Sequence, residues 1–531
     1  MAPTRREALA QLSALFALPL ADWSQPPTDP LRGTIAEYQA GRVMRRYSAE
    51  EVTTEALARC RTRGTQLHAI DQLASTAIAE ARESDARRAR GALRGALDGV
   101  PVFAKSIYDM AGLPTTASSA TWARLFPQPV ARDALEVQRL RAAGAVLLGK
   151  TAADDFAYRG NGTSSLTGQV HNPHDPTGVY TPGGSSAGAA VVVACGMAFA
   201  ALGTDDGGSN RIPAQFTGVV GMKPTFGVIP RTGVVPTWPY LDTHGPLART
   251  VADAAALYAA LVGPDTSDGL ALSTRGALPV LRDDALTGVR LGAVETHVPR
   301  AQMSSETLAA FDRALTDCAA AGAIVERFTP SITRATVRDA FQRAATARGD
   351  VAPNANAPAP TANALLRYFE SQMATDAQPR ERAMEAVLSG LDAFRAFYDV
   401  LPADPAAMAI LATQPYERDP AGQSFARSRR EIIDELAASM KAARIDVMIY
   451  PTMPFGAPRA VDAWPDVRTP LGYGNMLGVP EVSVPAGYAA NGMPVCNLSF
   501  VGIPGDDARV LACAHAYERR SQRFIVPPSA R

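Results

Sequence analysis

A glycine-rich stretch places one serine where it could act as a nucleophile. Residues 203–214 read Gly-Thr-Asp-Asp-Gly-Gly-Ser-Asn-Arg-Ile-Pro-Ala and lie between two apolar runs, which is unusual for a surface linker. Glycine lets a ligand approach the main chain closely, so the amides of this loop could converge on a developing negative charge. We therefore predict that Ser209 is a nucleophile and that Asp206, Gly207 and Gly208 bind the substrate.

A serine hydroxyl needs a base, and Lys105 is the candidate. Only four of the 52 basic residues are lysines, so the chain makes its surface charge with arginine. Lys105 ends the apolar run 100–104, which is typical of a buried strand. Burial can lower the pKa of a lysine by about 3–5 units, which would make Lys105 a neutral base. For Lys150 and Lys223 we expect the structural alternative, bonds to carbonyls or a carboxylate.

A second serine turn, residues 181–188, carries Ser185 and Ser186. Its Gly-Ser-Ser-Ala-Gly segment also satisfies the nucleophile elbow of α/β-hydrolases, with Ser186 at the centre. Such an elbow follows a strand, whereas Pro and Gly interrupt residues 175–182 too often for a regular central strand. The elbow is therefore the weaker interpretation. Three histidines could formally complete its triad: His244, His297 and His515.

Together these residues resemble the amidase signature family, whose Gly/Ser-rich signature spans both serines. Its catalytic set is a lysine, a serine on a cis peptide and a nucleophilic serine about two dozen residues later. Here 24 positions separate Ser185 from Ser209. The resemblance spans about residues 35–262 and 440–520. Further matching motifs are Gly149-Lys150-Thr151, Asn172-Pro173, Gly221-Met222-Lys223-Pro224-Thr225, Asp242-Thr243-His244-Gly245-Pro246 and Leu477-Gly478-Val479-Pro480.

The resemblance implies hydrolysis of linear amide C–N bonds through an acyl-enzyme. Neutral Lys105 would accept a proton from Ser185, which accepts one from Ser209 as Ser209 attacks the carbonyl. Ser185 would then protonate the leaving nitrogen. Aryl esters and carbamates suit the same oxyanion hole. We expect a small-molecule amide substrate and no cofactor, and leave a homodimer open as the oligomeric state.

Two departures from the family pattern stand next to the nucleophile. Asp206 occupies a position where Thr or an apolar residue is usual, and Asn210 replaces a common Ile. A carboxylate aimed at the oxyanion would oppose it, so we expect Asp206 to point away, or to bind a substrate cation or a main-chain group. Asp205 and Arg211 are expected to form a structural pair that braces the loop.

Two other functions compete with the hydrolase. The amidase subunit of a glutamine-dependent amidotransferase resembles Ser-Ile-Arg-Gln-Pro from the nucleophile onward, whereas residues 209–213 read Ser-Asn-Arg-Ile-Pro. This difference disfavours glutamine. A non-catalytic binding protein with the same fold would be expected to lack Lys105, Ser185 or Ser209, and all three are present.

Composition excludes several classes. The 52 basic and 52 acidic residues balance, so the net charge favours no nucleic-acid partner. The five cysteines show no C-x-x-C spacing, and Pro173 separates His171 from His174, so we predict no metal. Outside the N-terminal apolar run, no stretch reaches the roughly 18 uninterrupted apolar residues of a membrane span, so we expect none.

The alternation of elements predicts the α/β class, with helices on both faces of the sheet. The resemblance implies a single large domain, residues 31–531, with a mixed sheet, and a variable region, residues 265–437, that would shape the substrate pocket. The expected elements are a helix after the Ser48–Glu51 capping box, helices over 71–90, 133–143 and 508–519, strands over 100–104, 146–148 and 445–452, and a helix or strand over 187–201.

Residues 1–30 are interpreted as an export signal followed by a linker. Arg5 and Arg6 precede the uncharged, mainly apolar run 8–21, which resembles a twin-arginine signal with cleavage near Ala21. The alternative is an amphipathic helix packed on the enzyme. Both a periplasmic and a cytoplasmic location therefore stay open.

Overall fold

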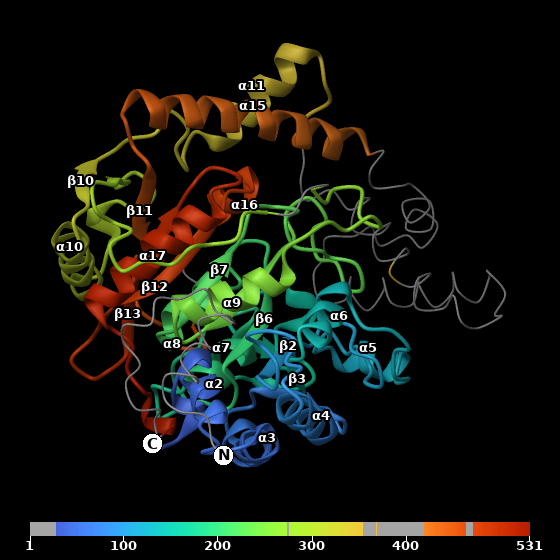
Figure 1. Cartoon of the computed structure of the whole chain (residues 1–531). Coiled ribbons are helices and arrows are strands. Elements are labelled where there is room, and N and C mark those ends of the chain that lie inside the picture. Colours follow the sequence, from blue (N-terminus) through green and yellow to red (C-terminus); the bar gives the residue numbers. More distant parts are fainter. Residues whose placement is uncertain (1–27, 273–275, 354–367, 369–418, 463–470, 531) are drawn as a thin grey trace.

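One mixed sheet runs through the computed structural model of the chain (Figure 1). The structure describes residues 28–272, 276–353, 368, 419–462 and 471–530. Within these residues the sheet has eleven strands, in the spatial order β1 (Ile70–Leu73), β3 (Val146–Thr151), β2 (Pro101–Lys105), β6 (Ala200–Asp205), β8 (Thr243–Ala248), β7 (Val220–Lys223), β12 (Glu481–Tyr488), β13 (Pro494–Val501), β11 (Val447–Pro451), β9 (Arg290–Ala293) and β10 (Ile324–Arg327). A small hairpin stands apart, β4 (Thr163–Ser164) with β5 (Gly168–Gln169).

Strand β2 lies between two parallel neighbours, β3 and β6, near one end of the sheet. Beyond β6 the pairing changes to antiparallel, through β8, β7, β12 and β13 to β11. All five residues of β2 are buried, as a short apolar strand with neighbours on both sides should be. The strand therefore delivers Lys105 at its carboxyl end inside the molecule, as predicted.

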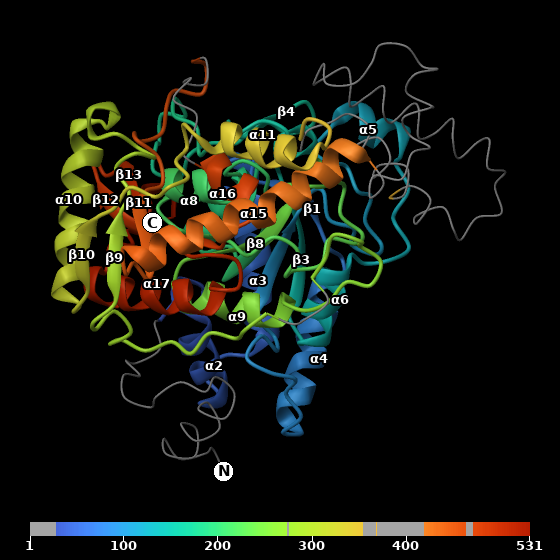
Figure 2. The ribbon, with the colours of Figure 1, turned by 90° about the horizontal axis from the view of Figure 1, so that it is seen from above.

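Helices cover both faces of this sheet, which confirms the predicted fold class. Helix α8, with α7 packed against it, lies on one side of the strands. Helices α9 and α17 lie on the other side from α8 (Figure 2). The described helices are α2 (Ile35–Val43), α3 (Ala49–Arg59), α4 (Ala77–Ala89), α5 (Ala120–Leu125), α6 (Leu135–Ala142), α7 (Ala187–Ala194), α8 (Arg211–Thr217), α9 (Val251–Leu261), α10 (Ser305–Ala320), α11 (Val337–Arg348), α15 (Pro420–Ala442), α16 (Leu471–Leu477) and α17 (Asp507–Ser521).

Local sequence signals place several of these elements. Helix α3 begins after Ser48, whose hydroxyl accepts from the Glu51 amide while the Glu51 carboxylate accepts from the Ser48 amide. This is the predicted capping box. The range 187–201 is both a helix and a strand, because α7 ends before β6 begins. The helix predicted over residues 71–90 is wrong at its start, because residues 70–73 form β1, which pairs with β3, and α4 begins only at Ala77.

Helix α7 is buried along its whole length, because its sequence Ala-Gly-Ala-Ala-Val-Val-Val-Ala is apolar all round. Gly188 lets the helix approach the chain after β3. A Cβ at this position would lie 2.7 Å from the main-chain nitrogen of Ala152. The close packing holds the serine turn before α7 against the strands that carry Lys105.

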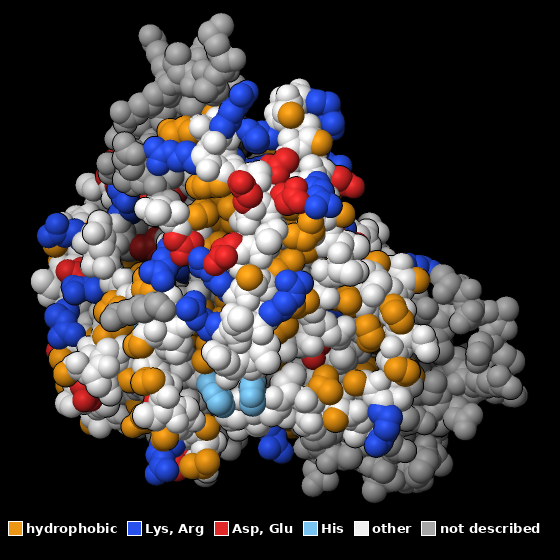
Figure 3. All heavy atoms as spheres, turned by 90° about the horizontal axis from the view of Figure 1, so that it is seen from below, with side chains coloured by type: hydrophobic (Ala, Val, Ile, Leu, Met, Phe, Trp, Pro, Cys, Tyr) orange, Lys and Arg blue, Asp and Glu red, His pale blue; other side chains and the backbone are white. Residues whose placement is uncertain are grey.

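The region 265–437 contributes strands and a helix to the body of the fold. Strands β9 and β10 extend the sheet, and α10 packs on β12 and β13. Residues 354–367 and 369–418 of this region, and the N-terminal segment interpreted as an export signal up to residue 27, lie outside the described residues. None of the described helices is long and apolar enough to cross a membrane. On the face in Figure 3, acidic and basic side chains are interspersed, in keeping with their equal numbers.

Candidate active site

The amine of Lys105 lies among three hydroxyl groups. Its Nζ is 2.7 Å from Ser185 Oγ, 2.9 Å from Thr204 Oγ1 and 3.1 Å from Ser186 Oγ. The side chain is fully buried, and no carboxylate of the described residues forms an ion pair with it. Burial lowers the pKa of Lys105 to about 8, and nearby carboxyls, Asp206 first among them, only partly oppose that effect.

The other two buried lysines have different partners. Lys150 donates to the Pro114 carbonyl at 2.8 Å and to the Thr115 hydroxyl. Lys223 donates to the carbonyls of Pro224 and Val479. These contacts confirm the structural role expected for both. Lys105 thus differs from them in having only hydroxyl groups as partners.

The two serines before α7 occupy different environments. Ser185 follows a cis Gly184–Ser185 peptide, and its hydroxyl contacts Lys105. Ser186 Oγ also contacts Lys105, but in addition it bonds to Asn210 Oδ1 at 3.1 Å and to the Thr204 carbonyl at 3.2 Å. Asn210, one of the two departures from the family pattern, therefore ties this turn to the loop after β6.

The elbow interpretation finds no support here. No regular strand precedes the turn, and none of the hydrogen bonds of Ser186 involves a histidine. His244 bonds to Glu136 and His515 to Asp283. His297 is buried against two tyrosine rings, and neither ring nitrogen has a hydrogen-bond partner among the described residues.

The loop between β6 and α8 presents Ser209 at its end. Ser209 is 7% exposed while Ser185 and Lys105 are fully buried, so among the three only Ser209 can meet a substrate directly. Next to it, Gly207 is partly exposed, and a Cβ at this position would meet no atom within 4 Å. Space therefore exists for a ligand beside this main chain. No hydrogen bond joins the Ser209 and Ser185 hydroxyls in the described part of the chain.

Three amides of this loop have no hydrogen-bond acceptor among the described residues: Asp206, Gly207 and Ser209. The Gly208 amide was predicted to join them but donates to Asp205 Oδ1 at 2.7 Å. Gly208 is needed for its conformation instead, with φ 119°. A Cβ there would lie 2.6 Å from the Leu471 side chain, so the position has no room for one.

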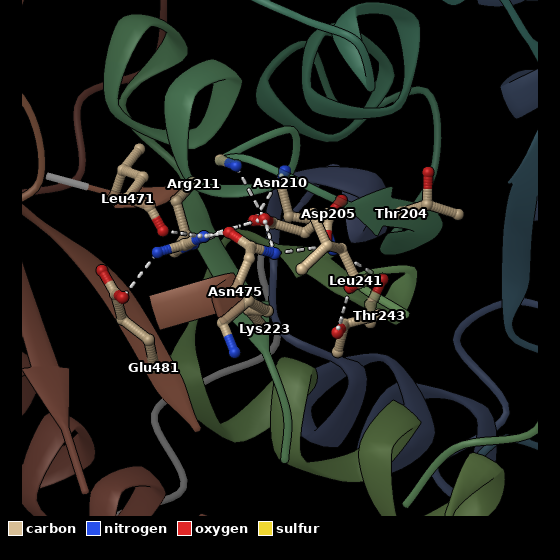
Figure 4. A network of polar contacts seen from close by, with 12 residues as sticks. Thr204, Asp205, Asn210, Arg211, Lys223, Leu241, Thr243, Leu471, Asn475 and Glu481 are labelled. Atoms are coloured by element: carbon tan, nitrogen blue, oxygen red, sulfur yellow. Dashed lines mark hydrogen bonds and ion pairs between the residues drawn. The ribbon is translucent and has the colours of Figure 1, made fainter. Parts of the chain in front are cut away.

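A buried ionic network fixes the shape of this loop (Figure 4). Arg211 binds Asp205 with two nitrogens, at 2.9 and 2.8 Å, and Glu481 with a third at 2.5 Å. Asn475 donates to the Asp205 carbonyl at 2.7 Å. Arg211 holds the pKa of Asp205 well below its usual range despite burial. The predicted Asp205–Arg211 pair is confirmed, whereas Asn475 and Glu481, about 270 residues away, were missed.

Asp206 points neither at a cation nor at a main-chain donor of the described residues. It is 3% exposed, and neither carboxyl oxygen accepts a hydrogen bond from these residues. The group within hydrogen-bonding reach is the carboxyl of Asp242. Burial, followed by the charge of Asp242, raises the pKa of Asp206 well above its usual range. Of the alternatives weighed from the sequence, pointing away from the oxyanion loop fits this placement.

Comparison with known proteins identifies the family. The family model described as Amidase matches residues 51–511. The chain belongs to the amidase family. This amidase-family protein is 34% identical to the glutamyl-tRNA(Gln) amidotransferase A subunit of Anaeromyxobacter sp. (strain K), over 95% of the chain and 99% of the relative. It is 33% identical to the corresponding protein of Myxococcus xanthus, over 92% and 98%.

Solved structures agree with this assignment. The peptide amidase of Stenotrophomonas maltophilia superposes on this amidase-family chain with a TM-score of 0.75 and 29% sequence identity. The match covers 93% of this chain and 98% of the peptide amidase. The fold is therefore that of amidase-family enzymes along almost its whole length.

Proposed function

We propose that this protein hydrolyses linear amide bonds with Ser209 as nucleophile and Lys105 as base, linked by Ser185. The observation that carries the proposal is the set of partners of Lys105. A neutral amine has two hydrogens and one lone pair. Ser186 has acceptors of its own, so it can accept from Lys105, as can Thr204. The lone pair is then left for the hydroxyl of Ser185, the closest of the three at 2.7 Å.

The same arrangement supports the rest of the reaction. Ser209 attacks the carbonyl as its proton passes through Ser185 to Lys105, and the free amides of Asp206, Gly207 and Ser209 stabilise the oxyanion. Ser185 returns the proton to the leaving nitrogen, because an amine anion is a very poor leaving group. Water then cleaves the acyl-enzyme by the reverse route. Aryl esters and carbamates offer a carbonyl of the same shape.

A second candidate is the amidase subunit of a glutamine-dependent amidotransferase. The identity of 33–34% to proteins of that name, over almost their full length, favours it. Against it stand Asn210 and Ile212, where that group has Ile and Gln. Asn210 donates to the Met222 carbonyl and accepts from the Ser186 hydroxyl, so this replacement has a structural role in the site. A non-catalytic binding protein is disfavoured, because Lys105 and both serines are retained.

The proposal is tested with the purified protein on chromogenic anilides, aliphatic amides, carbamates and L-glutamine. We expect amide cleavage, with glutamine as a poor substrate; glutamine as the preferred substrate would favour the amidotransferase function. Ser209→Ala should lower kcat/KM by about 10⁴-fold or more, since it removes the nucleophile and little packing. Ser186→Ala is the matched control. A larger loss in Ser186→Ala than in Ser209→Ala would restore the elbow interpretation.

A further inference from the structure

Two carboxyl groups face each other in the interior, close to Lys105. In the antiparallel ladder of β6 and β8, Asp205 lies opposite Thr243. Asp206 directly follows β6 and Asp242 directly precedes β8, so both residues lie next to this last pair of the ladder. Asp206 is 3% exposed and Asp242 is 6% exposed, and their carboxyls lie within hydrogen-bonding reach. The two carboxyls thus meet at the end of the ladder between β6 and β8.

The two carboxyls are not equivalent. Asp242 accepts hydrogen bonds from the amides of Trp238 at 2.7 Å and Thr237 at 3.2 Å, which stabilise its charged form. Neither oxygen of Asp206 has a donor among the described residues. Two ionised carboxylates are both acceptors and repel each other, so a hydrogen bond between them needs a proton. We place that proton on Asp206, because no donor of the described residues stabilises its charged form.

The remaining groups around Asp206 do not neutralise it. Lys105 forms no ion pair with a carboxylate of the described residues, and its nitrogen contacts hydroxyls. Asp205 is bound by Arg211 and stays ionised. The Tyr108 hydroxyl donates to the Gly203 carbonyl rather than to a carboxylate of the loop. A charged Asp206 would therefore add a second buried negative charge next to Asp242.

We infer that Asp206 and Asp242 hold one proton between them, that it resides on Asp206, and that the uncharged Asp206 carboxyl does not stabilise the ammonium form of Lys105. The first two parts concern the folded protein alone. The third rests on the proposed function, in which Lys105 works as a neutral base. Asp206 is then a positioning residue that acts through Lys105, because an ionised carboxylate there would stabilise the ammonium form instead.

Asp206→Asn tests the proton without any assay of activity. Asparagine keeps the shape, can donate its amide to Asp242 and cannot ionise. The wild type holds a proton that its unfolded chain releases above about pH 4, so its stability falls relative to the variant as pH rises. Between about pH 5 and 7 the ratio of the two unfolding equilibrium constants should change about tenfold per pH unit. Parallel pH dependences would overturn the inference. Asp462→Asn, at an exposed aspartate, is the matched control and should run parallel to the wild type.

Infrared difference spectroscopy gives a second readout that does not depend on unfolding. At neutral pH the spectrum of the wild type minus that of Asp206→Asn should contain the carbonyl band of a protonated carboxyl group. A difference made only of carboxylate bands would show that Asp206 is ionised and would overturn the inference. Both measurements stand even if the chain proves inactive on amides.

The link to Lys105 is read from the acidic limb of kcat/KM for an amide substrate. Its midpoint, rather than the maximal rate, is the readout. Asp206→Asn removes no charge beside Lys105 if Asp206 is uncharged, so the midpoint should coincide with that of the wild type. A shift to lower pH would mean that an ionised Asp206 had supported the ammonium form, contrary to the inference. If Lys105→Arg retained full activity, the proposed function would fail while the stability and infrared results still decided the shared proton.

Discussion

The partners of Lys105 separate it from the other buried lysines. Lys150 and Lys223 each donate to main-chain carbonyls, which cannot give a proton back. Lys105 meets only hydroxyls, which can donate as well as accept. Its proton can therefore move to and from Ser185, whereas the protons of the other two lysines are held in fixed bonds. The same residue type thus serves structure at two positions and, in the proposed function, chemistry at a third.

The lowered pKa of Lys105 predicts a pH profile. Only the neutral amine can accept a proton, so kcat/KM on an amide should fall about tenfold per pH unit below a midpoint near 8 and level off above it. Steady-state kinetics across pH 5–10, with the pH stability of the protein checked in parallel, measure this limb. A profile that rises toward acid pH would mean that the lysine acts in its protonated form.

Residue types alone predicted the three groups of the proposed relay, but not every contact around them. The run of apolar residues before Lys105 predicted the strand, and the glycines of residues 203–208 predicted the loop. The Gly208 amide could not be assigned, because its acceptor depends on the rotamer of Asp205. The direction of Asp206 depends on Asp242, and only the register of β6 against β8 puts the two together.

At the scale of elements, the loop between β6 and α8 depends on a brace from a distant part of the chain. Arg211 joins Asp205 on β6 to Glu481 on β12, and Asn475 on α16 closes the set. All four side chains are buried. The glycines make the loop flexible in principle, and this network selects one shape in which the amides of Asp206 and Gly207 stay free.

Arg211→Lys should therefore destabilise the protein strongly. Lysine cannot bind two carboxylates with the planar fork of arginine, so Asp205 or Glu481 would be left buried without its partner. We expect a loss of about 3–5 kcal/mol in the free energy of unfolding, measured by urea denaturation at pH 7. Arg282→Lys, at an exposed ion pair, is the control and should leave the free energy of unfolding unchanged within the error of the measurement. A loss below about 1 kcal/mol in Arg211→Lys would contradict the bracing role.

Through Asp205 this network makes the protein more stable as pH rises, whereas Asp206 makes it less stable as pH rises. The pKa of Asp205 is lowered in the folded state, so its stabilising contribution is present above about pH 4, the ordinary aspartate value, and is lost as pH falls below it. In Arg211→Met the cation bound to Asp205 is gone and only Lys223 remains to lower that pKa, so the loss of stability on acidification from pH 5 to pH 3 should be smaller than in the wild type. Chemical denaturation at several pH values measures it, and an unchanged acid dependence would remove the ion pair as its cause.

At the scale of the whole molecule, alternation in the sequence predicted an α/β sheet with helices on both faces, and the family resemblance predicted one large domain with a mixed sheet. The strand β1 was missed because four half-buried residues at a sheet edge lack a strong apolar signal. The contribution of β9 and β10 could not be foreseen, since the region 265–437 carries no motif. Strand β9 joins the sheet only by pairing with β11, and β10 only by pairing with β9. Long-range register and pairing are what local patterns leave undetermined.

The whole chain should work without a bound metal ion. The proposed chemistry assigns every proton transfer to lysine and serine, and the described residues contain no group of three or more His, Cys, Asp or Glu side chains placed to hold a metal. Dialysis against EDTA should change kcat/KM on an amide by less than about twofold, within the scatter of an unaffected site. Strong inhibition that added zinc reverses would overturn the metal-free relay.

The central claim, that Lys105 drives proton transfer through Ser185 to and from Ser209, is tested most directly by one comparison. In Lys105→Ala, kcat/KM is measured on an amide and on an activated ester with the same acyl group. An activated ester has a good leaving group, while the amide also needs its nitrogen protonated. We predict that the amide loses at least about tenfold more than the ester. Equal losses on both substrates would mean that Lys105 only holds the site together, and would contradict the relay.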